Sequence, residues 1–282
     1  MKRSMSLALS TVILITLFVS ISAIPAKCAT SGGITTLKPN VVYSSYDFTG
    51  NGKKDRFKFK PCGKNGDYYN KIEISVNGKI AYQQSGDYYY NTTLKLLTLS
   101  NGKKFLFVNT VGDNEDGPLK AVLQYKNGKY VKVLDFNKIL GKHGGHHNVY
   151  VSSVKGTAVT FKVFLMSWSV GNSYYSMQYA YQSGTLKQNS SAARLISVNL
   201  IRGNTRTLYV NKTINVYTTA STNQRAFVLH YGDKVTIDQC RISSTRMLLR
   251  VKYGNRYGWI IAASKYPVYQ SDKQFQEVGF AA

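Results

Sequence analysis

Apolar and polar residues alternate along most of the chain from Leu37 to Leu200, in short runs that end at turn residues. Alternation with a period of two is typical of strands that bury one face. Tyr, Val, Thr and Phe, which favour pleated sheets, are abundant in this region. No apolar pattern there predicts a helix longer than two turns. We therefore predict an all-β chain.

Five turn dipeptides separate these runs: Asn77-Gly78, Asn101-Gly102, Asn127-Gly128, Lys155-Gly156 and Ser183-Gly184. Such dipeptides form the tight turns of β-hairpins, so consecutive strands are expected to pair antiparallel. The hairpins fall into three groups, at about residues 55–84, 92–135 and 148–190. Units of this length are typical of propeller blades. We predict blade-like antiparallel sheets, in a propeller-like or sandwich arrangement, over residues 37–200.

A second series of short β-rich runs extends from Leu208 to Tyr266. Turn residues separate these runs at intervals of about 8 to 12 positions. Several short strands in so short a segment predict a small barrel, which we place at residues 204–270.

The motifs of this segment resemble those of bacterial SH3-like (SH3b, SH3 type 3) domains. Asn215-Val216-Tyr217 stands where that family has Asn-Val-Arg, Tyr231-Gly232-Asp233-Lys234-Val235 resembles its Gly-x-x-Val turn, and Tyr257-Gly258-Trp259-Ile260 matches its closing Gly-Trp-Ile. Tyr217 replaces the usual Arg, and Leu248 or a neighbour replaces a Trp. The resemblance implies binding to peptidoglycan or another wall component, without catalysis. The candidate contact residues are Tyr217, Tyr253, Tyr257 and Trp259.

The first 29 residues combine Lys2 and Arg3, an apolar run, and small residues near Ala26 and Ala29. This order is typical of a secretory signal peptide. The alternative is an uncleaved membrane anchor, because the apolar run is nearly long enough to span a bilayer. No later apolar stretch has that length, so we expect a mature chain without a transmembrane span that is secreted or associated with the cell wall.

The chain has 37 Lys and Arg against 13 Asp and Glu, a formal net charge of +24. Outside a cell such a protein is attracted to polyanions, including teichoic acids, acidic polysaccharides, anionic lipids and nucleic acid. The basic residues are spread singly or in pairs along the sequence, which favours a diffuse preference over a dedicated nucleic-acid site.

Oxygen-bearing side chains occupy alternate positions between Asp47 and Asp55, with Gly52 at the turn. A loop of this kind can wrap a hard cation such as Ca²⁺. It resembles the Asp-rich calcium loops that open the blades of integrin-like (FG-GAP, VCBS) propeller repeats. The candidate ligands are the side chains of Asp47, Thr49, Asn51 and Asp55 and the carbonyl group of Lys53. The alternative is a polar turn held by bonds from side chains to the backbone.

Two other clusters have residues of catalytic types. Gly112–Gly117 contains Asp113, Glu115 and Asp116, which could supply carboxylates for glycoside hydrolysis or form a solvated turn. His143–His147 contains three histidines, which could ligate zinc or belong to a mobile, exposed connection between sheets.

Tyrosines occur in runs at residues 68–69, 88–90 and 174–175, each after a glycine and a polar turn. Adjacent residues of a strand point to opposite faces, so at least one ring of each run is expected to face solvent. There it could stack on a sugar or contact a protein. Cys62 and Cys240 lie in different predicted domains, and nothing in the sequence requires a disulfide between them.

No cluster has the full set of groups that a catalytic site needs. The sequence therefore predicts a secreted, non-enzymatic binding protein that attaches to peptidoglycan or an anionic wall polymer such as teichoic acid. The β domain is expected to present a surface for a glycan or a protein. The alternatives are a hydrolase of the wall or of a polysaccharide, and an adhesin or interaction subunit with a protein partner.

Overall fold

The computed structural model describes residues 32–113, 117–189, 193–200 and 203–280, and the predicted signal peptide lies outside them. The described chain consists almost entirely of strands, with one short α-helix, α1 (Phe136–Leu140), and a 3-10 turn, η2 (Gln270–Asp272). The strands form four antiparallel sheets, which confirms the predicted all-β class. Within these residues no helix is both long and apolar enough to cross a membrane.

Each sheet is built mainly from strands that follow one another in the sequence. The N-terminal sheet contains β2 (Val42–Tyr43), β3 (Phe57–Asn65), β4 (Tyr68–Val76) and β5 (Lys79–Tyr89). The inner sheet contains β1 (Gly33–Leu37), β6 (Asn91–Thr98), β7 (Lys104–Val111), β8 (Lys120–Lys126) and β9 (Lys129–Asp135). The central sheet contains β10 (Gly144–Lys155), β11 (Ala158–Ser167), β12 (Gly171–Gln182), β13 (Thr185–Gln188), β14 (Arg194–Leu200) and β15 (Gly203–Thr205). The C-terminal sheet contains β16 (Thr207–Tyr209), β17 (Ile214–Tyr217), β18 (Arg225–Leu229), β19 (Lys234–Ile242), β20 (Met247–Tyr253) and β21 (Arg256–Ile261).

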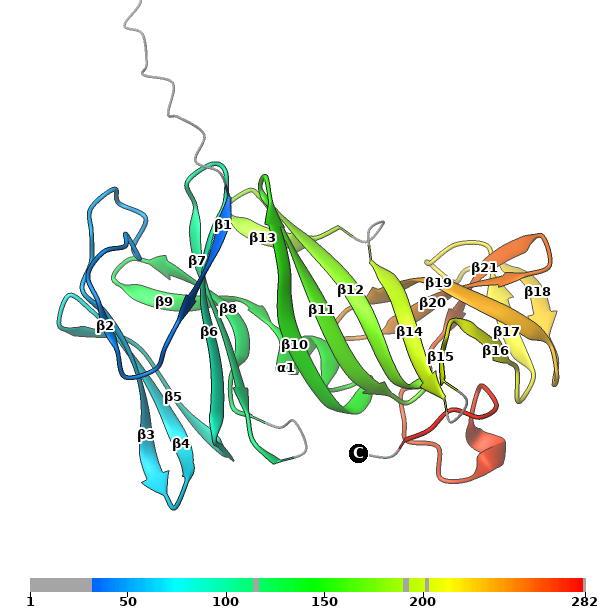
Figure 1. Ribbon diagram of the computed structural model, residues 1–282. Helices are drawn as coiled ribbons and strands as arrows, with labels where there is room; N and C mark the ends of the chain where they lie inside the picture. Colours follow the sequence, from blue (N-terminus) through cyan, green and yellow to red (C-terminus); the bar gives the residue numbers. More distant parts are fainter. Residues whose placement is uncertain (1–31, 114–116, 190–192, 201–202, 281–282) are drawn as a thin grey trace, which may run out of the picture.

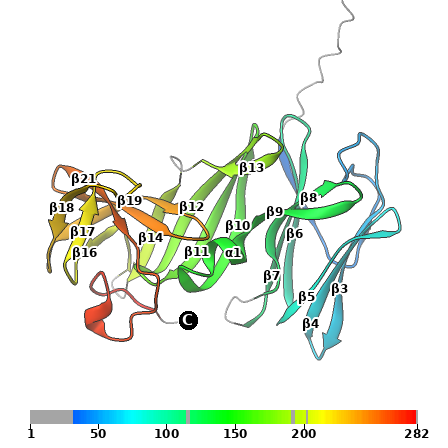
Figure 2. The same ribbon diagram turned by 180° about the vertical axis from the view of Figure 1, so that it is seen from behind.

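The sheets follow one another along the molecule, with the N-terminal and C-terminal sheets at opposite ends (Figure 1). Seen from behind, α1 lies where the inner and central sheets meet (Figure 2). The three predicted groups of hairpins thus correspond to three separate sheets, and β1 joins the second of them by pairing with β6.

The predicted turn dipeptides all lie at hairpin turns. Asn77 and Gly78 both have positive φ, 52° and 80°, and the same holds for the turns between β8 and β9 and between β12 and β13. Two successive residues with positive φ match the right-handed twist of the flanking strands, which explains why Asn-Gly predicts these hairpins.

The inner sheet is buried on both faces. Leu96 belongs to the core shared with the N-terminal sheet, while its neighbour Leu97 belongs to the core shared with the central sheet. Leu106 and Phe107 of β7 divide in the same way. The continuous burial of β7 therefore follows from its place between two layers.

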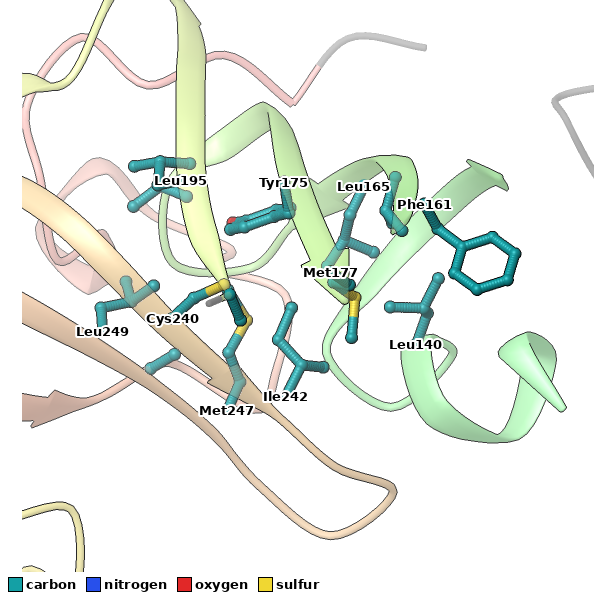
Figure 3. Packing of buried hydrophobic residues seen from close by; sticks show 14 of the residues in the cluster. Leu140, Phe161, Leu165, Tyr175, Met177, Leu195, Cys240, Ile242, Met247 and Leu249 are labelled. Atoms are coloured by element: carbon teal, nitrogen blue, oxygen red, sulfur yellow. The ribbon is translucent and has the colours of Figure 1, made fainter. Parts of the chain in front are cut away.

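A single apolar core joins the central and C-terminal sheets. Figure 3 shows Tyr175 and Met177 of β12 beside Cys240 and Met247 from β19 and the start of β20. Cys240 is completely buried. Because this core extends across the predicted boundary near residue 204, the C-terminal sheet is stabilised by packing against the central sheet.

The C-terminal sheet is open, whereas the sequence predicts a small barrel. Its strand order is β16-β19-β20-β21-β17-β18, and no ladder joins β16 to β18 in the part of the chain that is described. The free side of β16 is taken by the C-terminal segment instead. Val210 forms a bridge with Phe275, and the amide of Gln276 donates to the carbonyl of Tyr209. The C-terminal segment therefore occupies the edge of the sheet at the end of β16.

Candidate functional site

The C-terminal sheet has an inner face in the core and an outer face that points away from it. Val251 and Ile260 belong to the core, so the residues that alternate with them lie on the outer face. We define the outer face by Tyr217, Arg241, Leu248, Arg250, Lys252, Tyr257, Trp259 and Ile261.

Three of the four predicted wall-contact residues share this outer face. Trp259 stands directly opposite Tyr217 of β17 on one side and Arg250 of β20 on the other. Tyr257 stands opposite Lys252. Cross-strand neighbours on one face lie close enough for their side chains to interact. The sheet therefore brings together residues that are up to 42 positions apart in the sequence.

Tyr253, the fourth candidate, lies on the other side of β20. Its ring stacks with Phe227, with centroids 6.3 Å apart, and the Arg256 guanidinium lies over both rings. The Tyr253 hydroxyl donates a 2.8 Å hydrogen bond to Asp233, and this bond raises the pKa of the tyrosine. These contacts join β20 to β18 and to the turn before β19, so Tyr253 has a structural role apart from the outer face.

Cations cover the aromatic rings of the outer face. The Arg241 guanidinium lies 4.9 Å from the ring centroid of Trp259, which is only 8% exposed. Tyr257 is 51% exposed, with Arg250 and Lys252 at 5.5 and 5.6 Å from its centroid. A cation over an aromatic ring is attracted by the ring quadrupole. The rings therefore hold the cations in place and leave their charges available to an anionic ligand.

Arg250 is the outer-face cation that is paired. It forms a salt bridge with Asp238, and the hydrogen bonds from Arg250 to that carboxylate raise the pKa of the arginine. This pair offsets one positive charge, while Arg241 and Lys252 contact aromatic rings through their charged groups.

A pocket of about 240 Å³ lies at the end of the outer face. Its lining includes Gln188 from β13, Ala220 from the loop after β17, and Arg241, Ser243, Arg246 and Leu248 from the β19–β20 hairpin. Ala220 and Leu248 also pack against Trp259. The pocket is thus continuous with the predicted aromatic site.

A second pocket, of about 200 Å³, lies on the other side of Trp259. Tyr217 and Ile261 line it together with Asn215 and Lys212. Lys212 also lines a neighbouring pocket of about 340 Å³ that contains Lys265 and Tyr266. Basic and aromatic residues therefore continue along this side of the molecule toward the C-terminal segment.

In the predicted calcium loop, the side-chain oxygens are occupied by hydrogen bonds within the loop. Asp47 accepts from the amides of Gly50, Asn51 and Gly52, and Asn51 accepts from the amide of Lys53.

The buried carboxylate of Asp55 completes this loop. It accepts from the amides of Phe48 and Thr49 and from the side chain of Asn77. Phe48 stacks on Phe57 in the core, with ring centroids 4.1 Å apart. These bonds match the polar-turn alternative, and the calcium ligands Asp47, Thr49, Asn51, Lys53 and Asp55 stay a prediction.

The predicted mobile histidine loop is wrong, because Gly144–His147 begins strand β10. A Cβ on Gly144 would stand 2.2 Å from the carbonyl oxygen of Met166, so the glycine permits the close approach of β10 to the end of β11. His143 bonds to the carbonyl of Ser243, and His147 to the side chain of Asn137. Burial lowers the pKa of both histidines, which favours their neutral form.

Residues of two tyrosine runs and Asp113 meet at one end of the N-terminal and inner sheets. The rings of Tyr68 and Tyr90 make an edge contact at 5.7 Å, and the hydroxyl of Tyr68 points to Asp113 at 3.4 Å. Tyr88 and Tyr90 are about half exposed and Tyr89 is buried, which confirms the expected alternation. Glu115 and Asp116 lie outside the described residues.

Cys62 and Cys240 are both free thiols. Cys62 is on β3 and Cys240 is on β19, in sheets at opposite ends of the molecule.

Comparisons with protein-family models, curated proteins and solved structures found no match to this chain. Sequence reasoning found the aromatic residues of the outer face but missed Arg241, Arg246 and Gln188 as pocket residues. Basic residues at alternate positions of β20 were the available signal, since Arg250 and Lys252 share a face with Leu248. The approach of Gln188 to the β19–β20 hairpin had no signal in the sequence.

Proposed function

We propose that this protein is a secreted, non-enzymatic binding protein that attaches to an anionic polymer of the bacterial cell wall. The outer face of the C-terminal sheet is the proposed contact. The observation that supports this proposal is the set of cations held over Trp259 and Tyr257 at 4.9 to 5.6 Å. Arginine side chains held in this way lose little additional freedom when they bind a ligand.

The charge of this region supports an anionic ligand. Residues 203–280 contain 11 Lys and Arg against four Asp and Glu, and Asp238 is already paired with Arg250. A surface of this kind attracts polyanions and raises their association rate, and salt weakens the attraction. The resemblance of the Gly258-Trp259-Ile260 segment to wall-binding SH3-like domains agrees with the proposal.

Sedimentation with purified cell walls tests this function. The full chain without the predicted signal peptide should be used, because the C-terminal sheet shares its core with the central sheet. The test variant is Lys252→Gln with Tyr257→Ala, which removes one cross-strand pair from the outer face. The matched control is Lys162→Gln with Tyr150→Ala, which removes a cross-strand pair of the same composition from the central sheet.

The wild type and the control should sediment with walls at low salt, and the outer-face variant should remain largely in solution. Walls from which the anionic polymers have been extracted should retain little protein. Equal sedimentation of both variants would contradict the outer face as the contact. A wild type that never sediments would contradict the function itself.

A second candidate function is glycan binding at the cluster of Tyr68, Tyr90 and Asp113. Exposed tyrosine rings next to a carboxylate can stack on a sugar and accept hydrogen bonds from its hydroxyl groups. A glycan array probed with wild type and Tyr90→Ala would test it, with Tyr150→Ala as the control. Clearing of a peptidoglycan gel that is lost in Asp113→Asn would instead support the hydrolase alternative.

A further inference from the structure

We propose that the 240 Å³ pocket beside Trp259 binds a phosphodiester group of a polyol-phosphate wall polymer. The inference rests on the proposed wall-binding function and names the chemical group that the protein recognises. Arg241 and Arg246 supply the charge, and the remainder of the polymer lies along the outer face.

The pocket has the composition of an anion site. Arg241 and Arg246 line it together with Ser243, whose hydroxyl bonds within the hairpin turn, and within the described part of the chain none of its lining residues is acidic. Arginine presents a planar fork of N–H donors that matches the oxygens of a phosphate, which makes it a preferred residue for phosphate recognition.

Both arginines are held in position before any ligand binds. Arg246 donates to the carbonyl of Ala220 at 2.7 Å and to the hydroxyl of Thr222 at 3.2 Å. Guanidinium has five N–H donors, so these two bonds leave others for a ligand. Arg241 is held over Trp259. The pocket therefore requires little ordering of side chains on binding, a cost that otherwise reduces affinity.

The hairpin that carries these arginines is itself anchored. The amide of Ser243 donates to the carbonyl of Arg246 at 3.0 Å, and this bond closes the turn. The carbonyl of Ser243 in turn bonds to the ring of His143 at the start of the central sheet. Side chains on such a rigid support keep their geometry, as a recognition site requires.

Gln188 is a further polar residue of the pocket. Its Nε2 atom is buried and has no hydrogen-bond partner among the described residues, and Gln188 lines this pocket. A shift of the Gln188 side chain would expose this donor to the pocket, where an acceptor oxygen of a ligand could satisfy it.

The size of the pocket indicates one small group of a larger molecule. Pockets for whole drug-sized ligands have volumes of about 300–1,000 Å³, and this pocket is smaller. Leu248 of the pocket is followed on the same face by Arg250 and then by Lys252. Alternate residues of a strand are about 7 Å apart, so cations continue along the strand at regular intervals, with the Arg250 charge shared with Asp238. A polymer with regularly spaced anions fits this arrangement.

The aromatic rings favour a polyol phosphate over a nucleic acid. Single-stranded nucleic acids are bound without sequence preference by stacking their bases on aromatic side chains. Here Trp259 is nearly buried beneath Arg241, and Tyr257 is in contact with Arg250 and Lys252. A chain of polyols and phosphates needs no stacking surface and can contact the cations directly.

Binding of purified poly(glycerol phosphate) to the full chain without its signal peptide tests the inference, by calorimetric titration at low salt. The test variant is Arg241→Gln with Arg246→Gln. Its charge-matched control is Arg56→Gln with Arg206→Gln, which replaces two exposed arginines that belong neither to the pocket nor to the outer face. The pocket variant should bind at least about tenfold more weakly than the wild type, since a hydrogen bond to a charged group contributes about 1.5–3 kcal/mol. The control should weaken binding by less than half as much, when the two changes in Kd are compared as logarithms.

Arg246→Lys provides a second variant in case the double substitution unfolds the hairpin. It keeps the charge but loses the planar fork, so it should weaken binding while its thermal unfolding remains close to that of the wild type. Unchanged binding in Arg246→Lys and in a folded double variant would overturn the inference and leave the wall-binding function standing. Absence of binding by the wild type to both the polymer and intact walls would overturn both.

Competing polyanions identify the group that is recognised. Polygalacturonate, single-stranded DNA and vesicles of phosphatidylglycerol should each bind more weakly than poly(glycerol phosphate), and the pocket variant should affect them no more than the charge-matched control does. If the pocket variant weakens binding of polygalacturonate or DNA as much as binding of poly(glycerol phosphate), the pocket is a general polyanion site. An equal loss for the vesicles would assign it to a lipid head group. Either result would contradict the inference.

Discussion

Replacing Asp55 by Ala should strongly destabilise the N-terminal half of the protein. The carboxylate is 2% exposed and accepts bonds from the amides of Phe48 and Thr49 at 2.9 and 2.8 Å. It also accepts a 2.8 Å bond from the side chain of Asn77. The substitution leaves the buried amide of Phe48 without a partner, next to the stacked ring pair of Phe48 and Phe57.

The magnitude follows from the two backbone bonds. A hydrogen bond to a charged group contributes about 1.5–3 kcal/mol, so the loss of two should lower the free energy of unfolding by about 3–6 kcal/mol. For a protein of this size each kcal/mol lowers the melting temperature by about 2–4 °C, which gives a loss of about 6–24 °C. Asp55→Asn can keep one oxygen for the two amides, which both bond to Oδ2, but turns an NH₂ group toward the side chain of Asn77, so it should lose less than Asp55→Ala.

Thermal unfolding followed by circular dichroism measures this effect, with Asp47→Asn as the matched control. Asp47 also accepts backbone bonds, but the amides of Gly50, Asn51 and Gly52 are in exposed residues and can bond to water instead. Its replacement should cost about 0.5–1.5 kcal/mol. Equal losses for Asp55→Ala and Asp47→Asn, or a loss of less than about 2 °C in both, would refute the reasoning.

The same experiment tests the calcium hypothesis. If the loop holds Ca²⁺, adding millimolar Ca²⁺ should raise the melting temperature of the wild type. A chelator should lower the melting temperature, because it removes the contribution of Ca²⁺ binding to the free energy of unfolding. In Asp55→Ala this response should be lost. A wild type that shows no shift with Ca²⁺ or chelator, and no heat in a titration, would leave the polar turn as the only role of the loop.

Three further predictions concern the packing of the sheets. Burial lowers the pKa of His147 from 6.5 to about 4. Between these two pH values the histidine is protonated in the unfolded chain but not in the folded chain. The free energy of unfolding should therefore fall by up to about 3 kcal/mol as the pH drops from 6.5 to 4. Urea unfolding at several pH values should show that the free energy of unfolding depends less on pH in His147→Gln than in the wild type, while His230→Gln behaves like the wild type. The same pH dependence in His147→Gln and the wild type would contradict this. Gly144→Ala should lower the melting temperature by several degrees, because the new Cβ would meet the carbonyl of Met166 at 2.2 Å, whereas Gly33→Ala has no atom within 4 Å and should have little effect. A fragment of residues 204–282 should bind hydrophobic dyes and lack cooperative unfolding, since it exposes the core that it shares with the central sheet, and a cooperative transition equal to that of the full chain would disprove this dependence.

The parts of the fold that depend on local interactions could be predicted from the sequence. Asn77-Gly78 and Asn127-Gly128 form hairpins because their positive φ angles suit the turn wherever the strands lie. The all-β class follows from alternation that each strand carries in its own residues. The histidine segment shows the limit of this reasoning. In the sequence Gly144 and Gly145 suggest a flexible loop, but in the fold they allow close packing against Met166.

The candidate site could be predicted only in part. Tyr217, Tyr257 and Trp259 belong to recognisable motifs, and they lie on one face because the register of β17, β20 and β21 pairs them. Arg241 and Arg246 have no motif. Their role depends on the loop at Ala220 and on Gln188, which reach the hairpin through tertiary packing.

By itself, the sequence determined the class of the strands, their hairpin turns, the grouping into sheets and the excess of positive charge. These features depend on residues that are close together in the chain. Only the tertiary structure decided that the inner sheet is buried on both faces, that the last sheet stays open, and that a basic pocket forms beside Trp259. Each of these depends on contacts between distant segments. The C-terminal segment, for example, forms a bridge from Phe275 to Val210 at the end of β16, a contact that the local strand pattern does not indicate.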